Sequence, residues 1–275
     1  MLKPRLVLSN FAFCYSILKW FVLHLQRLKP IRFPLAVFVD KQWAKQLNNM
    51  RKSWWKIVCV CVLLYTVAGG LLFSMPAREI LHETVRNMFF HVCMWFAMMV
   101  LFTTSVVYSI KYLRTQNLRE DIYAVNFAKI GILFGVLGYS TGAVWAKYTW
   151  TEYADATQIF TEPKLTGAAI ALLIYFAYLV LRGSLNDIDK KARISAVYNI
   201  FAFAMLFPTI WILPRLMESL HPGKEGNPAL NFKDSDGRIK MVFYPAIIGW
   251  TLLGLWITSL KIRIDLIKEK SLLND

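Results

Sequence analysis

The sequence predicts an all-α, polytopic membrane protein with six transmembrane helices and with both termini in the cytoplasm. Apolar residues make up 57% of its 275 positions and the mean hydropathy is +0.43. Soluble domains rarely have such a composition. The charged residues, 18% of the chain, are confined to short stretches between long apolar runs. The length of those runs is the third observation that favours this fold class.

Crossing about 30 Å of hydrocarbon takes roughly 20 mostly apolar residues, because each helical residue rises about 1.5 Å. The spans are expected to be helices, since lipid offers no partner to free backbone groups. Lys129, Arg182 and Lys261 stand at span ends, where a long side chain can carry its charge to the headgroups. Six stretches reach or approach the required length without an internal Asp, Glu, Lys or Arg: Ile57–Met75, Met88–Ile110, Ile130–Ala146, Leu165–Leu181, Ala196–Leu213 and Val242–Leu260.

The basic residues of the loops predict the orientation, because loops rich in Lys and Arg resist translocation. The flank before the first span, the second loop, the fourth loop and the C-terminal tail are rich in them and are expected in the cytoplasm. The first and third loops hold two basic residues each and are expected outside. The fifth loop, 214–241, has five basic and four acidic residues, and alternation of the other segments places it outside.

Residues 1–49 are interpreted as a basic N-terminal arm or an upstream extension of the start, and residues 50–275 as the six-helix domain. Residues 1–56 hold eleven Lys and Arg against the single Asp40, which accounts for two thirds of the net charge of +15. A basic segment at the cytoplasmic face suits the anionic lipid of a bilayer. Nucleic acid is therefore not expected as a partner.

The cysteines form no Cys-x-x-Cys pair and the chain has no P-loop, so neither a c-type haem attachment nor nucleotide hydrolysis is predicted. Cys59 and Cys61 are spaced to face different sides of one helix, and buried apolar cysteines are expected. Pro208 predicts a bend at the outer end of the fifth span, which Pro214 follows. Four glycines of the third span share one helical face and predict close packing of another helix: Gly131, Gly135, Gly138 and Gly142.

Three histidines, His82, His91 and His221, fall on or near the outer side under this topology. His91 lies one turn inside the second span, and His221 lies in a Leu-His-Pro-Gly turn after the fifth. An axially ligated haem needs two imidazoles on opposite sides of an apolar slot. The alternative interpretations are a hydrogen-bonded buried histidine and a plain loop histidine. Cys93 points away from His91 on a helix and completes no zinc site.

The third loop supplies aromatic rings and two cations, Lys147 and Lys164. Flat rings can stack on a porphyrin and cations can meet its propionates. The alternative is an interfacial aromatic belt, which polytopic proteins generally have. The aromatic residues are Trp145, Tyr148, Trp150, Tyr153 and Phe160.

Four short segments resemble those of a known family, in the same order. They are Arg86–His91 (RNMFFH), Gly142–Trp150 (GAVWAKYTW), Pro163–Thr166 (PKLT) and Ser219–Gly223 (SLHPG). They are similar to CcmC, the haem-handling C subunit of system I cytochrome c maturation. The resemblance runs from about Met50 to Leu260 and includes the number of spans.

The resemblance implies that His91 and His221 are the axial ligands of a transient, non-covalent haem b. It places this site on the periplasmic side of a bacterial inner membrane. It also implies a haem-binding, tryptophan-rich loop that begins at Trp150, with Trp145 and Lys147 as its lead-in.

The same loop ends just before Lys164, with Glu162 where the family has aspartate. The chain departs from the family pattern between these points, because the segment TWTEYADATQIFTEPKLT at 149–166 lacks the family's glycine and later tryptophans.

By resemblance, the chain presents haem at the outer face and passes it to a membrane-anchored haem chaperone, together with ABC-type transporter subunits and without enzymatic activity of its own. Two alternatives stay open: a cytochrome c synthase-type haem lyase subunit and a small-molecule permease. A permease is expected to carry charged groups at mid-membrane, and the six spans hold no acid or base other than His91.

Overall fold

The computed structural model describes residues 41–76, 81–152, 154–217, 219–220 and 236–272. The chain divides into two units, Met1–Arg51 and Lys52–Asp275, and all side-chain contacts given below lie within the second. The described part of the chain is helical and has no strand. Its elements are α2 (Lys41–Leu72), η1 (His82–Asn87), α3 (Met88–Thr115), α4 (Leu118–Trp150), α5 (Ala156–Phe160), α6 (Pro163–Ser184), α7 (Ile188–Leu206), η2 (Phe207–Ile212), α8 (Leu213–Leu216) and α9 (Gly237–Leu272).

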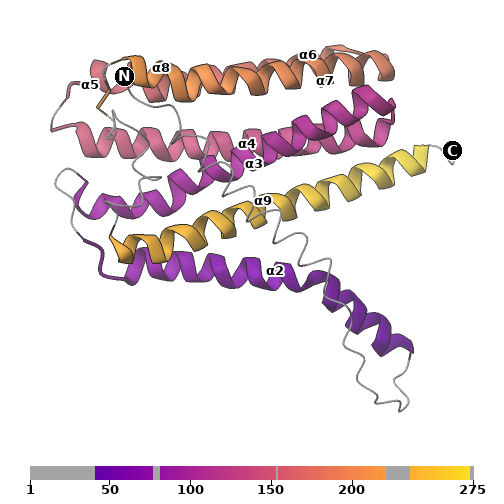
Figure 1. Ribbon diagram of the computed structural model, residues 1–275, viewed down its shortest axis with the longest axis horizontal. Coiled ribbons are helices and arrows are strands. Elements are labelled where there is room, and N and C mark those ends of the chain that lie inside the picture. Colours follow the sequence, from indigo (N-terminus) through magenta and orange to yellow (C-terminus); the bar gives the residue numbers. More distant parts are fainter. Residues whose placement is uncertain (1–40, 77–80, 153, 218, 221–235, 273–275) are drawn as a thin grey trace, which may run out of the picture. The chain divides into compact units, whose positions relative to one another are not determined.

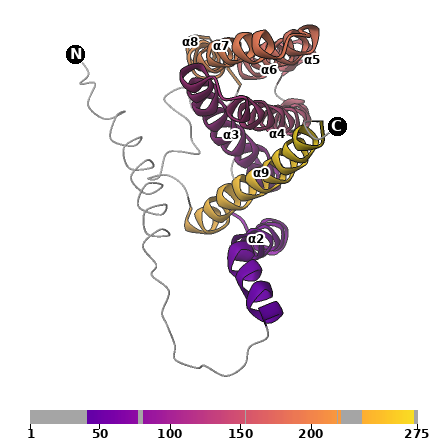
Figure 2. The ribbon, with the colours of Figure 1, turned by 90° about the vertical axis from the view of Figure 1, so that its right-hand side faces the viewer.

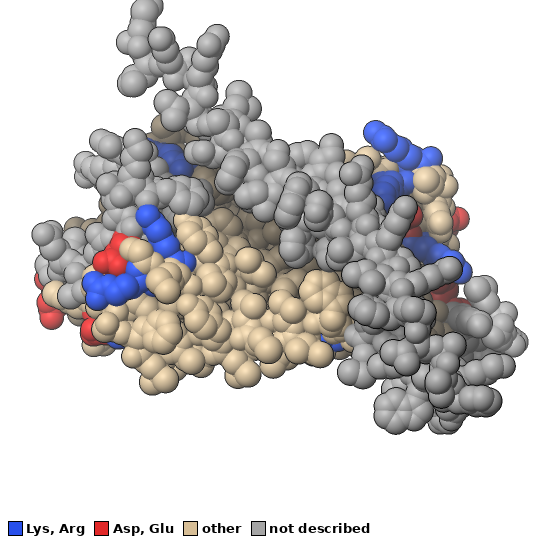
Figure 3. Space-filling view, turned by 60° about the horizontal axis from the view of Figure 1, so that its bottom comes forward, with Lys and Arg blue, Asp and Glu red and all other residues tan. Residues whose placement is uncertain are grey.

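Six helical segments are long and apolar enough to cross a membrane, which confirms the predicted fold class. On the face drawn in Figure 3, the visible charged side chains gather toward the two ends, and uncharged residues make up most of the described surface between them. This pattern is typical of a helix bundle with a hydrocarbon belt. The side on which each terminus lies stays a prediction. The segments are Ser53–Leu72, His82–Thr115, Leu118–Trp150, Pro163–Ser184, Ile188–Leu216 and Gly237–Glu269.

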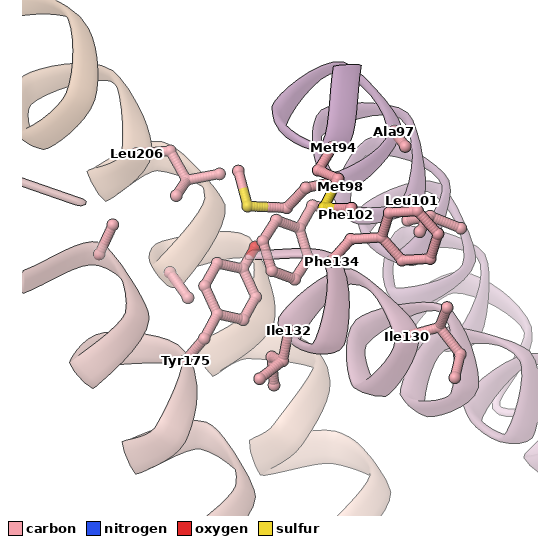
Figure 4. Close-up of a cluster of buried hydrophobic side chains, with 12 residues drawn as sticks. Met94, Ala97, Met98, Leu101, Phe102, Ile130, Ile132, Phe134, Tyr175 and Leu206 are labelled. Carbon is pink, nitrogen blue, oxygen red and sulfur yellow. The ribbon is translucent and has the colours of Figure 1, made fainter. Parts of the chain in front are cut away.

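Helices α3 and α4 occupy the middle of the bundle. Figures 1 and 2 show α6 and α7 on one side of this pair and α9 on the other. The second unit's part of α2 packs against α9, where the Cys59 thiol lies 3.8 Å from the Gly249 carbonyl. The main core lies between α3, α4, α6 and α7, and the rings of Phe102 and Tyr175 stack within it with their centroids 3.7 Å apart (Figure 4).

The glycine face of α4 packs against α3, which confirms the prediction of a close helix contact. A β-carbon at any of the four glycines would lie between 2.4 and 3.2 Å from a neighbouring side chain. The absence of that carbon lets large side chains of α3 lie directly on the backbone of α4. The pairs are Phe102 on Gly131, Met98 on Gly135 together with Leu172 of α6, Trp95 on Gly138, and His91 on Gly142.

The fifth span does not end at its prolines. Pro208 lies in η2, a π-helical turn, and the span continues through Pro214 in α8 to Leu216. Proline has no N–H to donate to the preceding turn, and π-turns occur where that ladder is interrupted. At the position of the predicted bend the structure has this π-helical turn, and the bend itself stays a prediction. The Thr209 carbonyl packs on Gly167 of α6, where a β-carbon would lie 2.0 Å away.

One sequence-based expectation about a single residue, the burial of Cys61, was wrong, and Arg182 has a partner that the sequence did not indicate. Arg182 forms a bidentate ion pair with Asp121 of α4, with N–O distances of 2.8 and 2.5 Å. A charge in a mostly buried position needs such a partner. Cys61 is exposed, whereas Cys59 and Cys93 are buried. Cys59 and Cys61 do face different sides of α2, as predicted. Cys14 lies outside the described residues.

Candidate functional site

One end of the bundle collects most of the predicted site residues. Figure 1 shows α5 and α8 at this end, where α3 begins, α4 ends and α6 begins. His91 lies in the first turn of α3, and Trp145 and Trp150 lie in the last turns of α4. Glu162 caps the N-terminus of α6 and Lys164 lies in its first turn. The topology thus brings residues from three spans to the same end of the molecule.

His91 is held in one orientation by a hydrogen bond to the backbone of α4. Its Nδ1 lies 2.8 Å from the Gly138 carbonyl and 3.4 Å from the Thr141 hydroxyl. A carbonyl can only accept, so Nδ1 carries the proton and Nε2 keeps its lone pair. Nε2 has no hydrogen-bond partner among the described residues. Metal-ligating histidines share this arrangement, since their second nitrogen donates to a fixed acceptor, and so do hydrogen-bonded buried histidines.

Two indoles flank the imidazole of His91. The ring centroid of Trp145 lies 5.7 Å from that of His91, and the ring centroid of Trp95 lies 6.3 Å from it. Both pairs have an edge-to-face geometry. The Trp145 indole N–H donates to the Thr84 hydroxyl at 2.9 Å, and that hydroxyl donates to the Leu81 carbonyl at 2.5 Å. Thr84 could not be recognised from the sequence, because only its contact with Trp145, 61 positions away, distinguishes it.

The residues just before His91 fasten the start of α3 to its neighbours. The Arg86 guanidinium donates to three carbonyls at the C-terminal end of α2, at 2.9 to 3.3 Å, and pairs with Glu83 at 2.7 Å. The Asn87 amide donates to the Thr141 carbonyl at 3.3 Å. Arg86 thereby satisfies helix-end carbonyls that have no partner within their own helix. In the sequence Arg86 was notable as a basic residue of the first loop and as the start of the segment Arg86–His91.

Trp150 lies in a small apolar cluster of its own rather than beside His91. It is 7% exposed and packs with Ala146 and with Ile159 of α5. Ile159 belongs to α5, the short helix in the loop after α4. Asp155 caps the N-terminus of α5 through a capping box. The rings of Tyr148 and Phe160 are about three quarters exposed. Lys147 is also exposed. Tyr153 lies outside the described residues.

Glu162 is 2% exposed and faces the segment that follows α8. Its carboxylate accepts hydrogen bonds from the Ser219 hydroxyl and from the Leu220 N–H, the latter at 2.9 Å. It also accepts from the Lys164 N–H at 3.5 Å, as the N-cap of α6. The Lys164 side chain is half-buried and interacts electrostatically with Glu162 and Arg215. The end of the aromatic loop and the segment before His221 thus meet at one carboxylate.

The other predicted ligand, His221, lies outside the described residues. His82 is exposed and begins η1 with a left-handed backbone, φ 43°. Cys93 is buried among residues of α3 and α9, with its thiol 3.9 Å from the Phe243 carbonyl, and points away from the His91 pocket. Among the described residues, no group of three His, Cys, Asp or Glu side chains could hold a metal ion.

Comparison with known proteins identifies a family over most of the chain. The family model described as CcmC, Heme exporter protein C, matches residues 35–272. This match confirms the resemblance found in the sequence motifs, and it begins within the predicted N-terminal arm.

The chain is 25% identical over 207 residues to Heme exporter protein C of Haemophilus influenzae, covering 74% of this chain and 79% of that protein. It is 30% identical over 149 residues to Heme exporter protein C of Bradyrhizobium diazoefficiens, covering 53% of each. A 34% identity over 114 residues links it to Cytochrome c biogenesis protein CcsA of Pelargonium hortorum. That alignment covers 41% of this chain and 32% of the CcsA protein, so the chain spans about a third of that relative's length.

Proposed function

Because the chain belongs to the CcmC, heme exporter protein C, family, we propose that it binds haem transiently at the end of the bundle that contains His91. The observation that carries the proposal is the state of the imidazole. Nδ1 is bonded to the Gly138 carbonyl, and Nε2 keeps the lone pair that iron requires. The haem is cargo, here taken to be non-covalent haem b, and His221 supplies the second axial ligand.

The surroundings of His91 fit a porphyrin. The indoles of Trp145 and Trp95 offer aromatic surface beside the imidazole, and such rings pack well against a flat macrocycle. Lys147 and Lys164 stand on the two sides of α5 in the sequence and can meet the propionates through charged hydrogen bonds. Trp150 would hold α5 in place in the loop, because its ring packs against Ile159.

In this proposal the bound haem is presented at the periplasmic face of a bacterial inner membrane and is handed to a membrane-anchored haem chaperone. ABC-type transporter subunits are the further partners, and the lipid bilayer surrounds the spans. The chain itself holds the haem between two histidines and makes no covalent bond to it. Among the described residues, the imidazole of His91 would bind the iron, and the indoles of Trp95 and Trp145 would contact the porphyrin.

An absorption spectrum of the full-length protein from haem-replete cells tests the proposal. Wild type should show six-coordinate, low-spin haem. His91→Ala should lose most of the haem, whereas His221→Ala should retain a five-coordinate form, and free imidazole should restore the missing ligand in each. His82→Ala is the matched control and should leave the spectrum unchanged. Haem-free wild type, or an unchanged low-spin spectrum in both test variants, would refute the proposal.

The two tryptophans should contribute unequally. Trp145→Ala removes the indole beside His91 and should weaken haem retention by about 0.5–1.5 kcal/mol beyond the area lost. Trp150→Ala removes the packing of α5 and should act mainly through that helix. If the double variant keeps full haem occupancy, these aromatic residues are an interfacial belt.

A second candidate is supported by the similarity to CcsA. According to this second candidate function, the chain is part of a synthase that attaches haem to a Cys-x-x-Cys-His substrate. Co-expression with an apocytochrome c, in cells that lack other maturation proteins, separates the two candidates. Covalent haem on the cytochrome would favour the synthase, and haem that stays on this chain would favour presentation alone.

A further inference from the structure

Two lysines mark the boundary of the hydrocarbon at the end of the bundle opposite His91. The apolar run of α4 begins directly after Lys129, and that of α9 ends directly before Lys261. Helix α4 starts and α9 finishes at this end, which Figure 1 shows opposite α5 and α8. The two helices have 33 and 36 residues, more than the roughly 20 that cross a bilayer. Both lysines are therefore expected at the level of the lipid headgroups.

The folded chain brings these two lysines close together on neighbouring helices. The Asn126 amide of α4 donates to the Asp265 carboxylate of α9 at 2.8 Å. Lys129 lies one turn after Asn126, and Lys261 lies one turn before Asp265. Lys129 therefore interacts electrostatically with both Lys261 and Asp265. Lys129 is exposed and Lys261 is half-buried, so a ligand at the surface of the bundle can reach both ammonium groups.

Neither of the two lysines is neutralised by an ion pair. Within the described ranges of the chain, no carboxylate pairs with either ammonium group. The nearby carboxylates have other partners: Asp265 accepts from the amide of α4, and Asp121 is paired with Arg182. Three cations and two carboxylates thus interact at this place. One positive charge is left over, and it belongs to the pair of lysines.

We propose that Lys129 and Lys261 bind the phosphate of an anionic phospholipid from the surrounding bilayer. Phosphate oxygens accept charged hydrogen bonds from ammonium groups, and the negative charge offsets the repulsion between the two lysines. Basic pockets between transmembrane helices bind anionic headgroups in this way. Leu133 and Leu137 follow Lys129 at intervals of one turn and are exposed, so they can contact the acyl chains. This apolar surface favours a lipid over a soluble phosphate.

Thermal unfolding of the full-length protein in a neutral detergent, with phosphatidylglycerol titrated in, tests the proposal. A ligand that binds the folded state raises the melting temperature, so phosphatidylglycerol should raise it, whereas phosphatidylcholine and inorganic phosphate should not. Lys129→Gln or Lys261→Gln should weaken the apparent lipid affinity roughly fivefold, and the double variant roughly 25-fold. Lys190→Gln is the matched control. It removes an exposed lysine at the start of α7, at the same end of the bundle, and should keep wild-type affinity.

Asp265→Asn should change the lipid affinity in the opposite direction. Asparagine keeps an oxygen that can accept from the Asn126 amide, but it removes the negative charge beside the two lysines. Phosphatidylglycerol should then bind severalfold more tightly, because less charge repels its phosphate. A purely structural role of this cluster predicts no such gain. If the lysine variants do not accumulate in the membrane, Asp265→Asn decides, and an affinity equal to or weaker than wild type overturns the proposal.

Three other outcomes would also overturn the lipid site. Equal responses to phosphatidylglycerol and phosphatidylcholine would mean that the headgroup charge is not recognised. An equal response to inorganic phosphate would mean that the lysines bind a soluble anion. Wild-type lipid affinity in the double lysine variant would place the lipid elsewhere on the protein. None of these measurements depends on bound haem, so their failure leaves the proposed function intact.

Discussion

Replacing Gly142 by alanine puts a methyl group into the space of the His91 ring. The new β-carbon would lie 2.4 Å from Cε1 and 2.9 Å from Nδ1 of the imidazole. Ordinary contact begins at 3.4 Å, so the ring must retreat by at least 1.0 Å. The helices cannot separate easily, because Gly131, Gly135 and Gly138 hold α3 and α4 together along the same face. The imidazole therefore takes up the shift.

This displacement breaks the 2.8 Å hydrogen bond between Nδ1 and the Gly138 carbonyl, since such bonds extend to only about 3.2 Å. Its loss costs about 0.5–1.5 kcal/mol, and overpacking costs about 1–3 kcal/mol. A deficit of about 2 kcal/mol in the liganded state corresponds to roughly 30-fold weaker haem binding. Without the hydrogen bond from Nδ1 to the Gly138 carbonyl, the orientation of Nε2 would also no longer be fixed.

The assay is the haem-to-protein ratio of purified full-length protein, with the absorption spectrum as the measure of ligation. Gly183→Ala is the control: no atom lies within 4 Å of its β-carbon, and alanine is favoured over glycine in a helix by about 1 kcal/mol. It should keep wild-type haem. Wild-type haem content and spectrum in Gly142→Ala would refute the placement of the His91 ring on Gly142 or its role as a ligand.

Three further predictions concern other parts of the chain. Thr84→Val removes the acceptor of the Trp145 indole N–H, at a cost of about 1–3 kcal/mol for the unsatisfied donor; haem content should fall and tryptophan fluorescence should shift, and no shift would contradict the contact. A chain that starts at Met50 should insert and bind haem normally; a topology reporter that places this end outside would contradict the predicted orientation. Asp121→Asn leaves Arg182 unpaired and should destabilise the fold by about 3–5 kcal/mol, and an unchanged melting temperature in detergent would show that the pair contributes little.

The spans could be predicted from the sequence because the property that defines them is local. Hydrocarbon imposes a length and a polarity on each span separately, so hydropathy alone located all six. The glycine face of α4 was predictable for the same reason, since helical geometry puts the glycines of one helix on one side. The sequence could not say which side chain fills the face, because His91 belongs to another helix.

The candidate site was predictable only where a residue type has its own chemistry. A histidine and a tryptophan near the ends of predicted spans stand out, as His91 and Trp145 did. Thr84 acquires its role from Trp145, 61 positions further along, and Arg86 from carbonyls 13 to 16 positions earlier, which only the folded chain brings beside it. The partner of Arg182 was unpredictable for a related reason, because Asp121 lies 61 positions earlier in the sequence.

The pocket of His91 is built from a continuous stretch of chain. Its contacts join Thr84, Trp95, Gly138 and Trp145 across the α3–α4 hairpin, whose turn is closed by the left-handed Gln116. All these groups are present once residue 145 has been synthesised, so the pocket can form on the ribosome while α6, α7 and α9 are still missing. Cross-linking of a cysteine pair at positions 95 and 138 in arrested chains would test this order. His221, the proposed second ligand, is synthesised only after this pocket is complete, so the two proposed ligands become available at different stages of synthesis.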